Sequence, residues 1–201
     1  MRIGIFGGTF NPVHLGHTLL SNYIGNLGLV DEVWLMVSPQ NPFKKDLQLI
    51  DEGIRYLLVS LAVEDYPRLR ACDFEFHLPR PSYTYNTLRE LTKVYPDDTF
   101  SLIIGEDNWQ KFSAWRNSEE ILAHYPLIVY PREGTAAPSS PVRHFPSVVH
   151  LPSAPLYPVS STAIREAIAA GQDVSEWLDP SVYDKIRELG IYGTEGFLTK
   201  A

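Results

Sequence analysis

Residues 3–17 read IGIFGGTFNPVHLGH, and they decide how the chain is expected to fold. The apolar run Ile3–Phe6 is typical of a buried strand. The Gly7-Gly8 pair lets the backbone turn sharply and approach a ligand closely, because neither residue has a Cβ. Asn11 can cap a helix, and Pro12 suits the first helical position, where no N–H is needed. The stretch therefore predicts a strand, a tight glycine turn and the start of a helix.

Two histidines follow the glycine turn, at positions 14 and 17. Residues three apart share one face of a helix, so both imidazoles are expected to point to the same side. A helix start also presents unpaired N–H groups and the positive end of the helix dipole, which favour an anion such as phosphate. We interpret His14, His17 and the glycine turn as parts of one phosphate-binding site.

Two other interpretations of His14 and His17 compete with this one. The first is a structural role, in which the two side chains cap or pack. The second is a metal site, but two histidines three apart are an incomplete ligand set, and no Cys or acidic residue is nearby. The stretch also lacks the Lys-Ser/Thr ending of a P-loop and the G-x-G-x-x-G of a dinucleotide-binding turn. Phosphate binding is the favoured interpretation.

The composition is that of an acidic protein with enough apolar residues for a substantial core. Of the 201 residues, 44% are hydrophobic, and the formal net charge is −7 without any block of Lys or Arg. This pattern argues against a general nucleic-acid-binding protein and against a membrane-surface protein. The length predicts one domain over residues 1–201.

The single cysteine, Cys72, excludes an internal disulfide and fits a reducing cytoplasm. It lies beside a predicted strand, where we expect it to be buried as a small apolar residue. The N-terminus has no charged-then-apolar signal pattern, and no apolar run reaches transmembrane length. We therefore expect a soluble, cytoplasmic protein.

Strand and helix patterns alternate along most of the chain. Strands are predicted at residues 3–6, 32–37, 69–74, 99–104 and 127–130, with an edge strand at 148–151. Later helices are predicted at residues 50–65, 84–95, 160–170 and 180–189, and another helix holds Trp115 near its beginning. This alternation predicts an α/β fold: a mostly parallel sheet with helices on both faces and a small C-terminal helical part. Residues 133–147, rich in Pro, Ser, Gly and Ala, are expected to form a surface loop.

Two candidate binding segments follow predicted strands. Lys44 and Lys45 lie in a loop after the second strand, at the edge where open α/β sheets bind ligands; two solvated lysines are the alternative. The turn Gly105–Asn108 follows the fourth strand. Its carboxylates can accept hydrogen bonds from ribose hydroxyls, and its glycine permits close approach.

Two further helix starts are candidates for anion binding. Ser82 or Thr84 can cap the helix at 84–95, although an ordinary capped helix is the simpler interpretation of that segment alone. The run Ser160–Thr162 opens a later helix with Arg165 one turn on, and arginine can bind phosphate with a fork of donors. Every candidate follows a strand or opens a helix, so all are expected to meet at one sheet edge.

These motifs resemble a known family. GGTFNPVHLGH at residues 7–17 resembles the signature of nucleotidyltransferases with an H-x-G-H motif, which join a nucleoside triphosphate to a phosphate-bearing acceptor and release pyrophosphate. Three further segments resemble, in the same order, nicotinate-nucleotide adenylyltransferases over nearly the whole chain: PSYTYNTL at 81–88, IGEDN at 104–108 followed by Trp115, and SSTAIR at 160–165. The S-Y-T-x-x-T-L run and the following Trp differ from phosphopantetheine adenylyltransferases and cytidylyltransferases.

The resemblance implies a Rossmann-like fold, ATP and nicotinate mononucleotide as substrates, Mg²⁺ with the ATP, and nicotinate adenine dinucleotide and pyrophosphate as products. It implies catalytic roles for His14, His17 and Arg165. It implies ATP binding by Gly7, Gly8, Thr9, Phe10, Gly105, Asp107, Ser160, Ser161 and Thr162. It implies acceptor binding by Lys44, Lys45, Ser82, Tyr83, Thr84, Asn108, Trp115 and Arg132. Within these sets Gly105 and Asp107 would face the ribose of ATP, one lysine would meet the acceptor phosphate, and Trp115 would stack on the pyridine ring, with packing in the core as the alternative for Trp115.

Three positions depart from the common family pattern. Asn11 stands where Asp is more usual, Glu106 where Ala is usual, and Phe43-Lys44 where Pro-His-Lys is common. The last departure leaves open which lysine binds the acceptor phosphate.

The expected chemistry needs no general base. A phosphate monoester has a second pKa near 6, so the acceptor is mostly a dianion at pH 7. We expect catalysis by positioning, positive charge and dipoles from His14, His17, Arg165, the lysine loop and Mg²⁺. Ser161 is disfavoured as a covalent nucleophile, because no His-Asp pair is placed beside it in the sequence. Alternatives are a nicotinamide-specific or dual-specific adenylyltransferase, an enzyme for another phosphate acceptor, and a catalytically silent nucleotide-binding protein on the same fold.

Overall fold

The fold is a parallel α/β sheet with helices on both faces. The computed structural model describes residues 1–39, 49–132, 134 and 147–193. These residues form a six-stranded sheet of order β3-β2-β1-β4-β5-β6, and every neighbouring pair is parallel. The strands are β1 (Arg2–Gly8), β2 (Glu32–Val37), β3 (Leu69–Cys72), β4 (Thr99–Gly105), β5 (Leu127–Tyr130) and β6 (Val148–His150). This is the Rossmann strand order, so the predicted fold class is confirmed.

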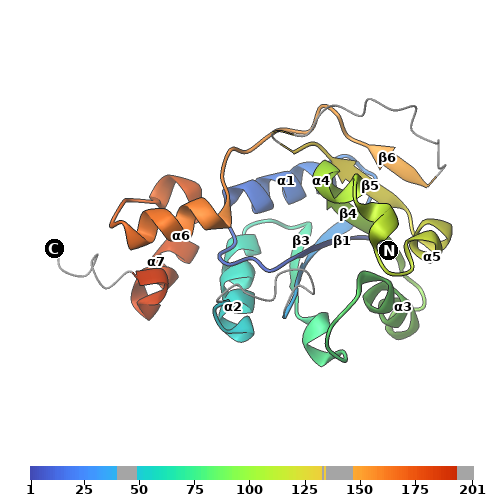
Figure 1. The fold of residues 1–201 in the computed structure, drawn as a ribbon, viewed down its shortest axis with the longest axis horizontal. Helices are drawn as coiled ribbons and strands as arrows, with labels where there is room; N and C mark the ends of the chain where they lie inside the picture. Colours follow the sequence, from blue (N-terminus) through green and yellow to red (C-terminus); the bar gives the residue numbers. More distant parts are fainter. Residues whose placement is uncertain (40–48, 133, 135–146, 194–201) are drawn as a thin grey trace.

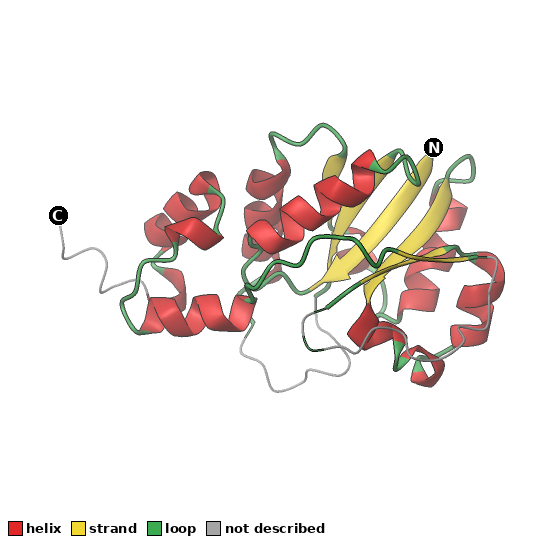
Figure 2. Ribbon diagram, turned by 90° about the horizontal axis from the view of Figure 1, so that it is seen from above, coloured by secondary structure: helices red, strands yellow, loops and turns green. Residues whose placement is uncertain are grey.

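The helices cover both faces of the sheet, as Figures 1 and 2 show. They are α1 (Leu15–Asn26), α2 (Glu52–Val63), α3 (Thr84–Val94), α4 (Glu106–Trp109), α5 (Ser118–His124), α6 (Ser161–Ala169) and α7 (Pro180–Leu189). Short 3₁₀ turns lie at Phe74–His77, Phe112–Ala114 and Ser175–Trp177. One apolar core joins the sheet to α1, α2, α6 and α7, and a second joins its other face to α3 and α5.

Strand β2 is apolar from Val33 to Val37 because both of its faces are buried. Val33, Leu35 and Val37 belong to the core on the α1 and α2 face. Trp34 and Met36 belong to the core on the α3 face, and all five side chains are at most 2% exposed. Alternate residues of a strand point to opposite faces of the sheet. A strand that is buried on both sides therefore needs apolar residues at consecutive positions.

The C-terminal helical part, α6 and α7, lies beyond the end of the sheet and next to α2 (Figure 1). Ile164 of α6 and Ile186 of α7 are each at most 1% exposed and belong to the same core as Leu58 of α2. The C-terminal helices are thus packed into the core of the sheet domain.

The start of the first helix differs from the prediction. Helix α1 begins at Leu15 with His14 as its N-cap, and Asn11 and Pro12 lie in a turn before it. The Asn11 side chain is taken up elsewhere: its Oδ1 accepts from the Tyr192 hydroxyl at 2.7 Å and from the Ile50 N–H at 3.4 Å. Contacts from distant parts of the chain have overridden the local capping signal.

The segment around β3 and α3 also differs. The third strand ends at Cys72, and Phe74 begins a 3₁₀ turn. Neither Ser82 nor Thr84 caps α3. The N-cap is Tyr83, which makes no side-chain cap, and the Ser82 hydroxyl donates to Glu75 Oε2 at 3.1 Å instead.

Three smaller differences lie near β4, β5 and β6. The turn predicted at residues 105–108 forms a short helix, α4, over residues 106–109. Trp115 precedes α5, which begins only at Ser118. Strand β6 ends at His150. The predicted loop at 133–147 lies mostly outside the described residues, and Cys72 is buried as expected.

Candidate active site

The two histidines stack against each other at the start of α1. The His14 and His17 ring centroids are 3.6 Å apart, with 29° between the ring planes. The His14 backbone N–H donates to Nδ1 of His17 at 3.2 Å. Because Nδ1 of His17 accepts this hydrogen bond, the neutral His17 ring carries its proton on Nε2. The helix start therefore fixes both the orientation and the tautomer of His17.

Both imidazoles are neutral near pH 7 in the free protein. Burial lowers the pKa of His14 to about 3, and the positive charge of Arg132 acts in the same direction. Burial also lowers the pKa of His17 well below its usual value, and His14 and Arg132 add to this effect. Of the positive charge and dipoles expected at this site, the histidines thus offer N–H dipoles to a ligand.

This burial predicts a pH-dependent stability. The unfolded His14 ring binds a proton below about pH 6.5 and the folded ring does not, so stability falls as the pH falls from 6.5 toward the folded pKa. Between pH 7.5 and 5.5 one such ring costs about 1.4 kcal/mol of unfolding free energy. Urea unfolding at the two pH values should show a smaller loss in His14→Asn than in the wild type. The exposed His77 provides the control: His77→Asn should lose as much as the wild type. Equal losses in the wild type and His14→Asn would contradict the neutral state of His14.

A buried arginine that the sequence analysis did not single out holds the turn before the histidines. Arg55 of α2 is 1% exposed, and its guanidinium donates to the carbonyl oxygens of Thr9 at 2.6 Å and Ser38 at 2.8 Å. It also donates to the carbonyls of Pro39 at 3.0 Å and Ile50 at 2.9 Å. Arg55 therefore ties the chain leaving β1 to the chain leaving β2.

Arg55 had a signal in the sequence. It is the first of the buried residues of α2, which recur at helical spacing and face the protein core: residues 55, 58, 59, 62 and 63. Leu57, an apolar residue of the same helix outside this core-facing stripe, is 40% exposed. A charged residue on the core-facing stripe marks a buried polar contact.

Helix α6 holds the same turn from the other side. The Ser161 hydroxyl donates to the Pro12 carbonyl at 2.8 Å, and Arg165 Nη1 donates to the Asn11 carbonyl at 2.7 Å. Ser160 caps the helix by accepting from Ala163 N–H at 3.1 Å, and Arg165 Nη2 donates to Thr162 Oγ1 at 3.3 Å. The structure thus brings together two predicted helix starts that lie about 150 residues apart in the sequence.

A cavity of about 300 Å³ opens beside the histidines. It joins the start of α1, the end of β5, the start of α6 and residues 155–159, which cross α1 on the way from β6 to α6 (Figure 1). Its lining is Phe6, His14, Gly16, His17, Leu20, Tyr130, Pro131, Arg132, Pro155, Leu156, Tyr157, Pro158, Val159, Ser160 and Ala163. Residues 155–158 carry no local sequence signal of a binding site, because they follow no strand directly and open no helix.

Two glycines allow close approach at this edge of the sheet. A Cβ on Gly105 would lie 2.5 Å from Asp107 Oδ1 and 3.0 Å from Arg132 Nε. Arg132 Nε is 3.6 Å from Asp107 Oδ1, so glycine lets these side chains meet above the end of β4. A Cβ on Gly7 would find no atom within 4 Å, so the space beside Gly7 is open. Arg132, predicted for the acceptor, lies in the cavity wall with the groups predicted for ATP.

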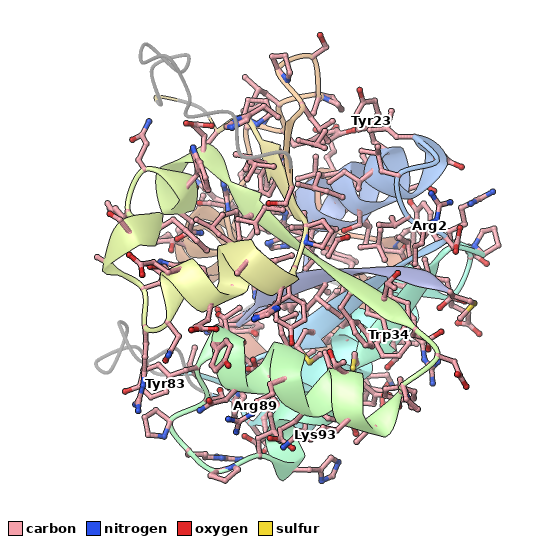
Figure 3. The ribbon with its side chains drawn as sticks, turned by 90° about the vertical axis from the view of Figure 1, so that its right-hand side faces the viewer. Arg2, Tyr23, Trp34, Tyr83, Arg89 and Lys93 are labelled. Atoms are coloured by element: carbon pink, nitrogen blue, oxygen red, sulfur yellow. The ribbon has the colours of Figure 1, made fainter. Side chains whose placement is uncertain are left out.

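The start of α3 and the segment holding Trp115, both predicted to bind the acceptor, lie together on the α3 face of the sheet. The Arg116 guanidinium lies 4.7 Å from the Tyr83 ring centre, so the segment holding Trp115 reaches the start of α3. The Trp115 ring packs at 5.3 Å from Phe112 and is partly exposed. Figure 3 shows Tyr83 at the start of α3, at the opposite end from Lys93. Asn108 is exposed on α4, and Lys44 and Lys45 lie outside the described residues.

Known proteins match this chain along most of its length. The Cytidylyltransferase-like family model matches residues 5–167. A relative from Bacteroides fragilis named "Probable nicotinate-nucleotide adenylyltransferase" is 49% identical over 185 residues, 92% of this chain and 90% of that protein. A relative of the same name from Flavobacterium johnsoniae is 40% identical over 96% of this chain and 99% of its own. The chain belongs to the nicotinate-nucleotide adenylyltransferase family.

A solved structure supports the fold. The Plasmodium falciparum nicotinic acid mononucleotide adenylyltransferase complexed with NaAD has a TM-score of 0.79 to this chain at 20% identity, covering 95% of this chain and 97% of that one. At this identity the likeness concerns the fold alone.

Two departures from the common nicotinate-nucleotide adenylyltransferase pattern have structural partners. Asn11 is 2% exposed, and its amide oxygen accepts from Tyr192 and Ile50, so an acceptor atom is needed there. Glu106 is 6% exposed and faces His150, with 3.6 Å between Oε2 and Nδ1. The third departure, Phe43-Lys44, lies outside the described residues.

The part of the chain that the structure describes holds no group of three or more His, Cys, Asp or Glu side chains able to bind a metal ion. Nor does any helix in this part have the length and apolar character needed to cross a membrane.

Proposed function

We propose that this chain transfers the adenylyl group of ATP to nicotinate mononucleotide, giving nicotinate adenine dinucleotide and pyrophosphate, and that residues 1–201 act as one nucleotidyltransferase domain. The observation that carries the proposal is the stacked His14–His17 pair beside the cavity and the Arg165 helix start, in a member of this family. Relatives are named as probable nicotinate-nucleotide adenylyltransferases, and a structural neighbour is described as complexed with NaAD. A catalytically silent binding protein would not need this set of converging donors.

ATP would occupy the cavity on the α1 face. The 155–159 segment supplies apolar surface for the base, including Leu156, which is 52% exposed at the cavity wall. Asp107 beside Gly105 would accept from ribose hydroxyls. The triphosphate would meet His14, His17, Arg132 and the start of α6, where N–H groups and positive charge favour an anion. Gly7, Gly8, Thr9 and Phe10 would border it from the β1 turn.

Nicotinate mononucleotide would bind on the α3 face. Trp115 would stack on the pyridine ring, and the first turn of α3, from Tyr83 and Thr84, would offer N–H donors to the carboxylate. Ser82 would shape this turn through its bond to Glu75, Asn108 would border the acceptor from α4, and Lys44 or Lys45 would bind the acceptor phosphate. The acceptor phosphate would then approach the ATP across the open space beside Gly7.

The reaction is an attack of one acceptor phosphate oxygen on the α-phosphorus of ATP. The new P–O bond forms as the bond to the bridging oxygen of pyrophosphate breaks, and no proton needs to leave the acceptor dianion. Negative charge builds on the α-phosphoryl oxygens and on the leaving pyrophosphate. His17, through Nε2–H, His14 and Arg165 would stabilise that charge with donors that the fold has already positioned.

Mg²⁺ would enter with the triphosphate. It binds oxygen ligands and usually keeps water and phosphate oxygens around it, so it does not require a cage of protein side chains. Its charge would offset part of the charge on the polyphosphate.

The fork of Arg165 gives a testable prediction. Arg165→Lys keeps the charge but cannot bind the Asn11 carbonyl and a phosphate oxygen with separate N–H groups in one plane. We expect kcat/KM for ATP to fall about tenfold or more in Arg165→Lys and further in Arg165→Ala. Steady-state kinetics on both variants provide the test, with Arg187→Lys on α7 as the control. Full activity in Arg165→Lys would mean that a point charge suffices.

Pyrophosphate release with ATP and a panel of acceptors tests the function itself. The panel consists of nicotinate mononucleotide, nicotinamide mononucleotide, phosphopantetheine and phosphate acceptors of the kind that cytidylyltransferases use with CTP. We expect nicotinate mononucleotide to give the fastest release by at least about tenfold. No release with any member would overturn the proposal in favour of a silent nucleotide-binding protein. Faster release with phosphopantetheine would show that phosphopantetheine, not nicotinate mononucleotide, is the acceptor.

A further inference from the structure

The carboxylate of Glu75 is buried near the start of α3, and the reaction described above does not use it. Glu75 lies in the 3₁₀ turn Phe74–His77 and is 7% exposed. Its two oxygens accept from two hydroxyls: Thr87 Oγ1 donates to Oε1 at 2.8 Å, and Ser82 Oγ donates to Oε2 at 3.1 Å.

The two donors lie on either side of the helix start. Ser82 immediately precedes the N-cap Tyr83, and Thr87 lies in the first turns of α3. Ser82 is 7% exposed and Thr87 is 2% exposed, so water does not compete for these bonds. Because Tyr83 makes no side-chain cap, the pair of bonds to Glu75 takes over the task of fixing where α3 begins and how its first N–H groups point.

We propose that Glu75 is a positioning residue that sets the preference for nicotinate over nicotinamide mononucleotide. This inference rests on the proposed function, in which the first turn of α3 binds the nicotinate carboxylate. A carboxylate accepts from two donors only if both are correctly aimed, whereas the amide of nicotinamide has one acceptor oxygen and an NH₂ group. Fixing the donors therefore favours the carboxylate more than the amide. Arg116, over the Tyr83 ring, places the Trp115 segment beside the same turn.

The negative charge of Glu75 works in the opposite direction. A buried carboxylate behind the helix start repels an anionic ligand, so removing its charge alone would raise the preference for nicotinate. Losing the two hydrogen bonds would lower that preference. Two substitutions separate these effects: Glu75→Gln removes the charge but keeps groups that can bond both hydroxyls, and Glu75→Leu removes the charge and both bonds while keeping the volume.

The measurement is the ratio of kcat/KM for the two mononucleotides, taken on the same enzyme preparation. The fraction of folded enzyme cancels in this ratio, so a loss of stability alone does not change it. We expect Glu75→Leu to lower the ratio about tenfold and Glu75→Gln to leave it within about threefold of the wild type. Glu90→Gln, at a partly exposed glutamate of α3 that pairs with Lys93, is the control and should keep the wild-type ratio.

A second pair of variants examines the bond partner. Thr87→Val alone should lower the ratio below the wild-type value. Combined with Glu75→Leu it should lower the ratio no further than Glu75→Leu alone, because the bond that it removes is already lost. An unchanged ratio in Glu75→Leu would overturn the proposal and leave Glu75 a purely structural residue. A higher ratio in both Glu75 variants would also overturn it, since charge would then dominate. A wild-type ratio near one would instead contradict the proposed acceptor.

Discussion

Replacing His17 by alanine should lower kcat by about a hundred- to a thousandfold, while KM for ATP changes by less than about threefold. Removing one fixed donor to charge that builds in the transition state typically costs this much turnover. The His17 proton lies on Nε2 because Nδ1 accepts the His14 N–H at 3.2 Å, so the donor is set before substrate arrives. Steady-state kinetics with ATP and nicotinate mononucleotide provide the measurement.

Two other substitutions at this position separate catalysis from folding. In His17→Asn, Oδ1 can replace Nδ1 as the acceptor for the His14 N–H, but nothing replaces Nε2–H. His17→Asn should therefore be stable and nearly as slow as His17→Ala. His17→Gln carries an NH₂ group further out and should recover part of the activity. Normal turnover in His17→Asn would show that the ring serves only to cap α1.

Replacing Arg55 by methionine should lower the unfolding free energy by at least about 3 kcal/mol. Arg55 donates to four backbone carbonyls from a position that is 1% exposed. An unsatisfied buried acceptor costs about 1–3 kcal/mol, and methionine fills the volume without replacing any donor. Because the Thr9 carbonyl is one of the four, kcat of the folded variant should fall as well.

Urea unfolding monitored by circular dichroism measures the stability of Arg55→Met, and kinetics at a temperature where the variant is folded measure its activity. Arg55→Lys can satisfy fewer carbonyls and should lie between the wild type and Arg55→Met. Arg89 on the outer side of α3 (Figure 3) serves as a control, and Arg89→Met should change the unfolding free energy by less than about 0.5 kcal/mol. A stable and fully active Arg55→Met would contradict the role given to this guanidinium.

The helices and strands whose bounds were predicted best from the sequence are those whose local residue pattern agrees with their packing. Strand β2 has its predicted bounds because both of its faces are buried, so a continuous apolar run marks the strand from Val33 to its end at Val37. Helix α7 has its predicted bounds because Asp179 caps it, Pro180 opens it and Gly190 ends it in the left-handed region. In each case the ends are signalled by residues next to the element itself.

The first helix was misplaced because its start is decided by distant residues. Asn11 reads locally as a cap, but Tyr192, Arg165 and Ile50 bind its side chain and carbonyl across the fold. Such bonds leave no periodic trace in the sequence near residue 11. Glu75 was missed for the same reason, because its partners Ser82 and Thr87 look like ordinary helix-start residues.

Much of the candidate site was nonetheless accessible from the sequence. The histidine pair and the Ser160–Arg165 helix start each carry local signals, and the structure brings them to one cavity. The position of Arg132 in the wall of this cavity has no local signal in the sequence, because it depends on the packing of β5 against β4 and on the absence of a Cβ at Gly105.

Competition between the two mononucleotides tests the central claim most directly. The enzyme receives equal concentrations of nicotinate and nicotinamide mononucleotide with limiting ATP, and the two dinucleotide products are quantified by chromatography. Their ratio equals the ratio of the two kcat/KM values. An unpaired buried polar group costs about 1–3 kcal/mol, and each 1.4 kcal/mol is a factor of ten. We therefore expect nicotinate adenine dinucleotide in about ten- to several-hundredfold excess. Equal amounts, or an excess of the nicotinamide product, would contradict the account.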